Sequence, residues 1–517
     1  MNVHPRIVFL VIMLVAAFLR LWMLDLRPPH FDEGVNGMFV DQMTEEGFYR
    51  YDPENYHGPL HMYATFISQT LGGRNLWALR LPAVLASLLT VWAVWRFWEF
   101  FGVRAAGLAA AFAAVSPGFV FFGRYAIHES WMTFFLALTL HGILGVWQRG
   151  AKRDLYWLCA GVAGMVLTKE TYVIHLVAFG AAFGVLALWQ RVIDSEPPCP
   201  VAPWHFWTGD IVRGVGVAAV AVLLFYSGFL MVPEAVSGLW KTFGYWFATG
   251  MESAGHDKPE YTIGAFLGQF HWLCWLGWFK WPNFYWLAMM AVWELGALVG
   301  FLACFYYVGR SDARVRWLAI VASGTLLAFS IIPYKTPWCM VSIIVPFLLV
   351  AGAFLASRPI FIWLPVGAFV CAVGLLQSCL LNFRWYDSDS KMPSYVYVQT
   401  YREFDTAVAP LLDKARSDAS FYHAPGHVML ESYHPLPWVL GDFTNVLYSE
   451  DEGKLDAPAF VICSKGEAES VLAALRGEYY RKDFKLRSGL GLCTVFFNAE
   501  WFGDVFGDET LERGGKQ

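Results

Sequence analysis

The sequence predicts a polytopic α-helical membrane protein that ends in a soluble α/β domain. Of its 517 residues, 57% are hydrophobic and only 15% are charged, whereas a soluble domain of this length carries about a quarter charged residues. Apolar runs of roughly 18 residues or more, long enough to cross a bilayer, recur along the first three quarters. The last quarter is polar and alternates helix-like with strand-like segments.

The apolar runs predict about eleven transmembrane helices. The first follows Arg6 and has no small-residue cleavage site at the position a signal peptide needs, so we interpret it as an uncleaved span. The predicted spans are Ile7–Leu24, Leu81–Phe97, Ala106–Phe122, Trp131–Trp147, Leu155–Leu167, Tyr172–Trp189, Ile211–Met231, a span within Phe284–Val308, Trp317–Ile332, Met340–Ala356 and Ile360–Leu381.

The short loops indicate the orientation, because Lys and Arg concentrate on the cytoplasmic side of membrane proteins. With eleven spans, the basic loops fall on one side: Arg104, Arg149, Lys152, Arg153, Arg191, Arg310, Arg314, Arg316 and Arg358. We therefore expect a transmembrane domain over residues 1–381, with long external loops at about 25–75 and 232–283. Arg20, in the first span, is expected to extend to the outer interface.

Residues 382–517 predict an external α/β domain. Helical spacing at Tyr401–Ala415 and Glu467–Leu475 alternates with strand-like runs at His427–Leu430, Ala459–Cys463 and Leu492–Phe497. No Gly-rich phosphate loop follows these strands, so nucleotide binding is not indicated. Cys463 and Cys493 could pair, although both also fit buried strand positions. The net charge of −5 is spread without a strong block, which argues against a nucleic-acid partner.

Acids, histidines and single cations gather on the predicted outer face. The first external segment holds His30-Phe31-Asp32-Glu33 and His57-Gly58-Pro59, and Arg80 follows. Three short turns on the same side carry Arg124 with His128-Glu129, Lys169-Glu170, and Lys335. Solvated loop residues are the alternative for any one of these groups. An acid–base pair in several very short turns favours a functional site.

Two further groups are candidates for contact with the substrate. Glu294 is an acid within an apolar run, which marks a functional residue or the outer end of the eighth span. His256, in Gly255-His256-Asp257-Lys258-Pro259, could belong to a mobile loop over the site or to an ordinary solvated loop.

These residue types suit sugar transfer from a lipid phosphate. A carboxylate can take the proton of an acceptor hydroxyl. Cations can hold the phosphate leaving group as its negative charge develops. A site at the bilayer surface lets a polyprenyl tail stay in lipid while the sugar phosphate reaches water.

The assembled motifs resemble the GT-C superfamily of glycosyltransferases, which use polyprenyl-phosphate sugars and include protein O-mannosyltransferases and lipid A aminoarabinose transferases. They look most like the family of flippase-activity-associated proteins of glycosylation pathways. The resemblance rests on His30–Glu33, Tyr51-Asp52-Pro53-Glu54 with His57–Pro59, Arg80-Leu81-Pro82, His128-Glu129, Thr168–Glu170, Gly255–Pro259, Tyr334–Trp338 and Pro435-Leu436-Pro437-Trp438, and it spans nearly the whole chain.

The resemblance implies an inverting transfer on the non-cytoplasmic face of the cell (inner) membrane. Asp32, beside Glu33, would be the base, and Glu129 would be a second carboxylate that orients the acceptor or a metal. The aminoarabinose transferases carry Lys-Pro-Pro where this chain has His57-Gly58-Pro59. The donor phosphate would therefore be bound by His57 or by a cation among Arg80, Arg124, Lys169 and Lys335.

Some superfamily members need a divalent metal and others do not. No cofactor is certain here, and Asp32, Glu129 and His128 could ligate a metal. The acceptor could be a glycan, a lipid or a protein. A flippase or transporter of lipid-linked sugar is the rival function, although transporters place ionisable groups near the midplane of repeated halves. An inactive relative that only binds lipid-linked sugar is the third alternative.

Overall fold

The computed structural model describes residues 4–55, 57–194, 201–252, 256, 258, 261, 283–309, 312–387, 394–451, 456–507 and 509–515. The chain forms two compact units. Unit 1 comprises residues 1–24, 43–384 and 391–395, and unit 2 comprises residues 25–42, 385–390 and 396–517. Each unit is described by itself.

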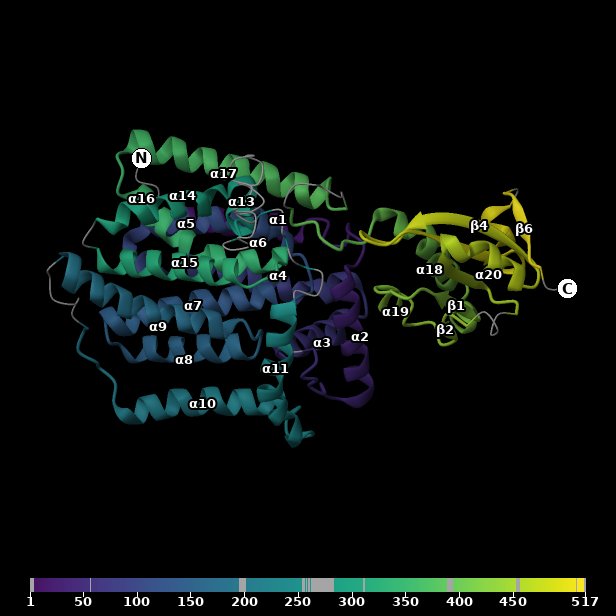
Figure 1. Ribbon diagram of the computed structural model, residues 1–517, viewed down its shortest axis with the longest axis horizontal. Coiled ribbons are helices and arrows are strands. Elements are labelled where there is room, and N and C mark those ends of the chain that lie inside the picture. Colours follow the sequence, from purple (N-terminus) through teal and green to yellow (C-terminus); the bar gives the residue numbers. More distant parts are fainter. Residues whose placement is uncertain are drawn as a thin grey trace, which may run out of the picture. The chain divides into compact units, whose positions relative to one another are not determined.

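Unit 1 is built from helices, most of which run side by side (Figure 1). Eight of its described helices are long and apolar enough to span a membrane, and α13 with α14 would form a ninth span bent by 119°. Its α-helices are α1 (Pro5–Leu21), α3 (Leu60–Gly72), α4 (Leu76–Trp95), α5 (Trp98–Val115), α6 (Pro117–Phe122), α7 (Glu129–Gln148), α8 (Lys152–Val166), α9 (Tyr172–Trp189), α10 (Thr208–Tyr226), α11 (Gly238–Glu252), α13 (Tyr285–Trp293), α14 (Leu295–Val308), α15 (Ala313–Ile331), α16 (Met340–Ala356) and α17 (Ile360–Phe383).

The predicted class is confirmed, and the expected number of spans needs adjustment. A helix lies at each of the eleven predicted positions, but α1 and α8 have only 17 and 15 residues. At 1.5 Å per residue they are roughly 25 and 22 Å long, short of the ~30 Å hydrocarbon thickness. The eighth predicted span is the bent pair, broken at Glu294. Within the described residues, eight helices, or nine with the bent pair, are therefore long and apolar enough to span a membrane.

Helix α16 lies at the centre of unit 1. Of the residues in its most apolar stretch, 83% are buried, against 11% for α10. It packs against α5, α7, α14 and α15, while α7 packs along α4 and α8. Helix α10 instead leaves Val212, Val215, Val220 and other apolar side chains exposed. An apolar exposed face on a long helix is suited to lipid.

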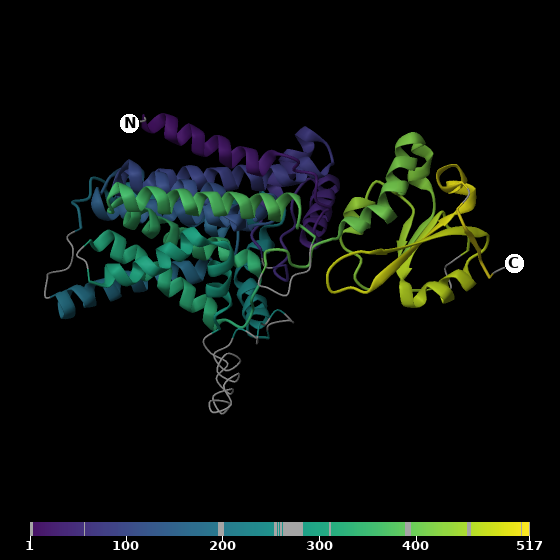
Figure 2. The ribbon, with the colours of Figure 1, turned by 90° about the horizontal axis from the view of Figure 1, so that it is seen from above.

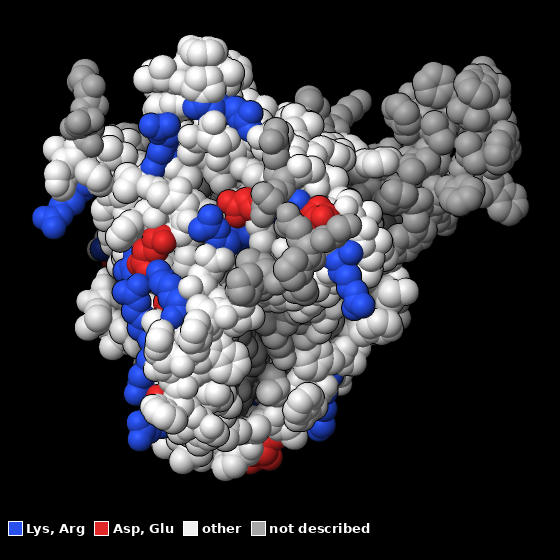
Figure 3. Space-filling model, turned by 90° about the vertical axis from the view of Figure 1, so that its left-hand side faces the viewer, with Lys and Arg blue, Asp and Glu red and all other residues white. Residues whose placement is uncertain are grey.

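Contacts between the short loops place several predicted basic loops at one end of unit 1. Arg149, between α7 and α8, and Arg153, at the start of α8, pair with Glu99 at the start of α5. Arg314 of α15 donates to the carbonyl of Phe100, and Arg104 donates to that of Ala356 at the end of α16. Figure 3 looks onto this end and shows Lys and Arg side chains over it.

The expectation that the Arg20 side chain extends to the outer interface is wrong. Its guanidinium is fully buried and donates to Ser87 Oγ at 2.7 Å and to the carbonyls of Ala113 and Ala114. These acceptors lie on α4 and at the end of α5, so Arg20 ties three helices together. A buried guanidinium is stable only where such acceptors are provided.

The expected external loops contain helices. Helix α2 (Phe31–Glu46) and helix α3 occupy much of residues 25–75, and α11 follows a 3₁₀ turn at Pro233–Ser237 in the second loop. Most of residues 253–282 lies outside the described part of the chain. The sequence did not reveal α2, because its polar and apolar residues show little helical periodicity.

Unit 2 contains a mixed sheet, seen in Figure 2. Its six described strands have the order β2-β1-β3-β5-β4-β6. Strand β1 runs parallel to β2 and β3, and the other pairings are antiparallel. The strands are β1 (Gly426–Met429), β2 (Val446–Tyr448), β3 (Phe460–Ser464), β4 (Glu478–Lys485), β5 (Leu492–Asn498) and β6 (Leu511–Arg513); the α-helices are α18 (Asp405–Ser417), α19 (Leu436–Val439), α20 (Ala468–Ala474) and α21 (Ala499–Phe506).

Helices cover both faces of this sheet, which confirms the predicted helix-on-sheet arrangement. Helix α18 contributes Leu411 to one core, and α20 contributes Val471 to the other. Cys463 belongs to the second core and Cys493 to the first, and both thiols are free. The register pairs Cys463 with Thr494, so the two cysteines point to opposite faces and cannot form the disulfide considered from the sequence.

Candidate functional site

The His57-Gly58-Pro59 segment is fixed against the turn between α8 and α9. The amide of Gly58 donates to the carbonyl of Thr168, and that of Leu60 donates to Leu167, each at 3.0 Å. A Cβ on Gly58 would lie 2.2 Å from the Leu167 oxygen, so only glycine allows this approach. The contact brings His57 Nδ1 to 3.0 Å from Oε2 of Glu170, whose carboxylate is buried.

Three histidines cluster beside this contact. The ring centroid of His128 lies 4.7 Å from that of His57 and 4.9 Å from that of His61. Burial, together with the neighbouring His57, His61 and Lys169, holds the pKa of His128 well below 6.5. Its ring is therefore neutral near pH 7. His61 was not predicted as a site residue, although its position four residues after His57, at the start of α3, was a signal in the sequence.

Glu129, which follows His128 in the chain, and Lys169, which precedes Glu170, form a buried ion pair. Glu129 begins α7, and Lys169 lies in the turn before α9; their Oε1 and Nζ atoms are in contact. Each residue is only 6% exposed. Burial opposes the charged form of Lys169, but Glu129 outweighs it and the pKa of the ammonium rises. The structure thus brings together four predicted residues: His57, His128, Glu129 and Lys169.

The other predicted cations donate to backbone carbonyls. Arg124 binds four carbonyls at the end of α1, including those of Trp22 at 2.7 Å and Met23 at 2.5 Å. Arg80 donates to the carbonyl of Leu24 at 2.7 Å. Lys335 donates to the last carbonyls of α15, including Phe329 at 3.0 Å. These bonds satisfy helix-end acceptors, and they occupy donors that a phosphate would otherwise use.

Glu294 and His256 have other partners. Glu294, at the break between α13 and α14, accepts hydrogen bonds at 2.8 Å from Ser116 Oγ, Gly118 N and Tyr395 Oη. These bonds anchor the start of α6. The carbonyl of His256 accepts from Lys335 N at 3.0 Å, and its ring packs on Tyr334. Asp257 lies outside the described residues.

Asp32 and Glu33 belong to unit 2 and differ in availability. Both lie in the first turn of α2, and Glu33 Oε2 accepts from the amide of His30 at 2.9 Å. Glu33 is fully buried, whereas the Asp32 side chain is 37% exposed. Asp32 has His30 as a neighbour, at 3.7 Å from Nδ1 to Oδ2. Within this pair of carboxylates, Asp32 is the one open to a substrate.

Residues from the C-terminal part of unit 2 surround this turn. The ring of Phe31 lies 5.1 Å from that of His434 and 4.5 Å beneath the guanidinium of Arg487. Helix α2 approaches the Pro435–Trp438 segment so closely that a Cβ on Gly34 would lie 2.6 Å from Pro435. Arg487 and His434 were not predicted as site residues, because no local pattern connects them to a segment so much earlier in the chain.

A metal site receives no support from the described residues. Within them, no group of three or more His, Cys, Asp or Glu side chains is placed to hold a metal ion. Asp32 lies in unit 2, and Glu129 and His128 lie in unit 1. Metal dependence stays a prediction from the resemblance.

Comparison with known proteins connects the fold to one family. Residues 56–201 match the model of the family described as dolichyl-phosphate-mannose-protein mannosyltransferase. No protein of curated function matches the sequence. Among solved structures, ArnT from Cupriavidus metallidurans bound to undecaprenyl phosphate is similar, with a TM-score of 0.55 and 16% identity over 95% of this chain and 97% of that chain. The apo state of ArnT gives a TM-score of 0.54, also with 16% identity and the same coverage.

The donor-bound Pmt1-Pmt2 complex of S. cerevisiae is also similar, with 19% identity over 50% of this chain and 36% of that chain, but its TM-score of 0.30 is too low to bear on the fold. The expected resemblance is confirmed by the family match and by the fold shared with ArnT. The chain therefore has the fold of ArnT, and residues 56–201 are similar to the mannosyltransferase family.

Proposed function

We propose that the protein is an inverting glycosyltransferase that moves a sugar from a polyprenyl-phosphate donor to a hydroxyl acceptor. The observation that carries the donor assignment is the buried Lys169–Glu129 pair beside the His57–Glu170 contact. These groups are the cationic and hydrogen-bonding partners that a leaving phosphate requires. ArnT, which shares the fold, was solved with undecaprenyl phosphate bound.

Unit 1 would hold the donor phosphate. Lys169 supplies a permanent cation, and His57 supplies a ring nitrogen whose partner, Glu170, orients it. Arg80, Arg124 and Lys335 support the helix ends around these groups through backbone carbonyls. We assign these three cations to helix ends and not to the phosphate, because carbonyls already accept hydrogen bonds from them.

Asp32 would be the base. As the acceptor oxygen attacks the anomeric carbon, its proton passes to the Asp32 carboxylate. The bond from that carbon to the phosphate oxygen breaks, and polyprenyl phosphate leaves with the electron pair. A single displacement inverts the configuration at the carbon. The exposure of Asp32, compared with the buried Glu33, supports this choice within the pair.

The site would face the non-cytoplasmic side. The turns that carry Glu129 and Lys169 lie at the opposite ends of α7 and α8 from Arg149 and Arg153. The concentration of arginine at one end of unit 1 indicates the cytoplasmic end. This placement supports transfer at the outer surface of the cell membrane to a glycan, lipid or protein acceptor.

The test is turnover of a radiolabelled polyprenyl-phosphate sugar by purified protein in detergent. Asp32→Asn should lower the release of polyprenyl phosphate by about 10²- to 10⁴-fold, the usual effect of losing a general base, while donor binding is kept. Glu45→Gln, at an exposed acid of the same helix, is the matched control and should keep full activity. Full turnover by Asp32→Asn would remove the base assignment. Donor binding without turnover by the wild type, together with translocation in liposomes, would favour a flippase.

A further inference from the structure

A second charged site lies at the arginine-rich end of unit 1, away from the proposed donor site. A surface hollow there is lined by Arg96, Trp98, Glu99, Arg149 and Arg153. These residues come from the junction of α4 with α5 and from the loop and helix that follow α7. Figure 3 faces this end of the unit and shows acidic side chains set among basic ones. None of these residues takes part in the function proposed above.

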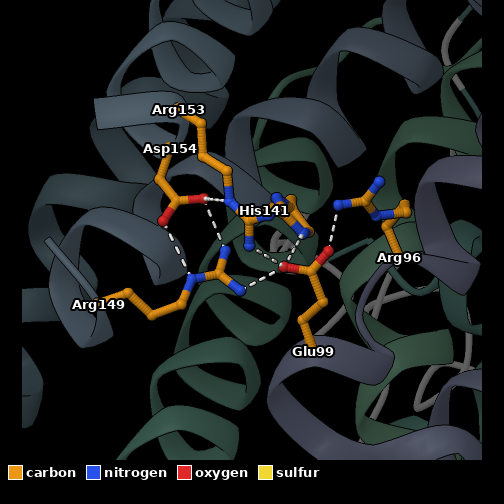
Figure 4. A network of polar contacts seen from close by, with 6 residues as sticks. All are labelled: Arg96, Glu99, His141, Arg149, Arg153 and Asp154. Atoms are coloured by element: carbon orange, nitrogen blue, oxygen red, sulfur yellow. Dashed lines mark hydrogen bonds and ion pairs between the residues drawn. The ribbon is translucent and has the colours of Figure 1, made fainter. Parts of the chain in front are cut away.

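Glu99 is the centre of the network (Figure 4). Its Oε1 pairs with Arg96, and its Oε2 accepts from Arg149 and, at 2.8 Å, from Arg153. Asp154, which is fully buried, accepts two hydrogen bonds from Arg149, at 3.0 Å to Oδ2 and 2.6 Å to Oδ1. All four carboxylate oxygens therefore already accept hydrogen bonds from guanidinium groups.

The network contains more positive than negative groups. Three guanidinium groups face two carboxylates, which leaves one positive charge in excess. A guanidinium has five N–H donors, whereas Arg153 donates one hydrogen bond to Glu99, has its Nε 3.7 Å from Asp154 Oδ1, and keeps a side chain that is 57% exposed. The side chains of Arg96 and Arg149 are 28% and 25% exposed. The carboxylate oxygens of Glu99 and Asp154 already accept hydrogen bonds. An anion entering the hollow would therefore meet the remaining N–H groups of the guanidiniums.

The surroundings indicate the depth of lipid headgroups. Trp98, which lines the hollow, is 45% exposed, and the guanidinium of Arg96 lies 5.8 Å from the Trp92 ring centroid. Tryptophan at a helix end is typical of the membrane–water interface. Basic pockets between transmembrane helices at this depth bind phosphate headgroups.

We propose that the hollow formed by Arg96, Arg149 and Arg153 binds the phosphate of an anionic phospholipid. A phosphodiester carries one negative charge, which matches the single excess positive charge of the network. Its oxygens accept from the outward N–H groups of Arg153 and the partly exposed arginines beside it, and its acyl chains remain in the bilayer. A guanidinium fork suits this role better than an ammonium, because it can donate two parallel hydrogen bonds to one phosphate.

Native mass spectrometry of the full chain in detergent, titrated with phosphatidylglycerol, measures this binding. Arg153→Gln should weaken phosphatidylglycerol binding about fivefold, the effect of one arginine near an anionic lipid surface. Arg153→Lys should recover only part of it. The matched control is Arg213→Gln, because Arg213 is 74% exposed and pairs with Asp210 at the same end. That variant should bind as the wild type does.

Two further probes identify the ligand. Phosphatidylcholine, which has no net charge, should bind more weakly to the wild type and should not respond to Arg153→Gln. Inorganic phosphate that competes at millimolar concentration would show that the phosphate alone is recognised, whereas no competition would show that the lipid tail is required. Equal losses in Arg153→Gln and Arg213→Gln, or no loss in either, would overturn the site and leave the network as a clamp between helices.

Discussion

Replacing Lys169 by Gln tests whether this residue only stabilises the fold through its ion pair or also binds the donor phosphate. Glu129 and Lys169 are each 6% exposed, so the substitution leaves a carboxylate buried without its counter-charge. Breaking a buried pair from one side costs about 3–5 kcal/mol of unfolding free energy. Lys152→Gln is the matched control, because Lys152 pairs with Asp210 but is 47% exposed. Because solvent screens this exposed pair, the variant should unfold at the same detergent concentration as the wild type.

The effect on donor binding is separable from this loss of stability. A hydrogen bond to a charged group contributes about 1.5–3 kcal/mol, so losing the Lys169 contact should weaken polyprenyl-phosphate binding by about 10- to 150-fold. Unfolding by detergent titration and binding of a labelled polyprenyl phosphate measure the two quantities on one preparation. In the double variant Lys169→Gln/Glu129→Gln, stability should return to within about 1 kcal/mol of the wild type, because no buried charge remains unpaired.

Donor binding should stay weak in that double variant. If it instead binds polyprenyl phosphate as tightly as the wild type does, the pair only joins α7 to the α8–α9 turn. The phosphate-binding role of Lys169 would then be refuted. That outcome leaves the test of Asp32 unaffected, because the role of Asp32 as the base is tested by turnover and not by donor binding.

Two other predictions test the packing of α2 and the titration of Lys335. A Cβ on Gly37 would lie 2.3 Å from the Trp438 ring, so Gly37→Ala should cost about 1–3 kcal/mol of stability in a thermal melt; Gly209→Ala, which meets open space, is the control, and equal melting temperatures would contradict the close packing. Burial lowers the pKa of Lys335 to about 8, so the folded state binds fewer protons than the unfolded state between about pH 8 and 10.5, and stability should rise with pH across that window by up to about 3 kcal/mol. Lys335→Met should abolish this rise, and an unchanged slope in that variant would assign it to other groups.

The membrane fold was predictable because each span is a local property of the chain. A helix must satisfy its backbone groups internally in lipid, so an apolar run of sufficient length is enough to identify it. The break at Glu294 was less accessible to prediction. The apolar pattern continues through it, and the bend depends on hydrogen bonds from Ser116, Gly118 and Tyr395, which are distant in sequence.

Residue type alone could not rank the four cations that were candidates for binding the donor phosphate. Arg80, Arg124, Lys169 and Lys335 all stood at positions expected to face one membrane side. The structure distinguishes them by their partners, since Lys169 contacts a carboxylate and the other three donate to helix-end carbonyls. Every residue has a backbone carbonyl, so no sequence pattern predicts which carbonyl accepts a hydrogen bond from a given cation. Arg20 was misplaced for the same reason.

By itself, the sequence determined the membrane class, the positions of the helices and a set of polar residues that resembles the GT-C superfamily. Apolar length, the distribution of arginine and short motifs are all readable within a few residues. Only the tertiary structure decided that His57, His61, His128, Glu129 and Lys169 lie together, and that Arg487 covers the turn of Asp32. Such contacts join residues far apart in the chain, and they depend on how helices and strands pack rather than on any local pattern.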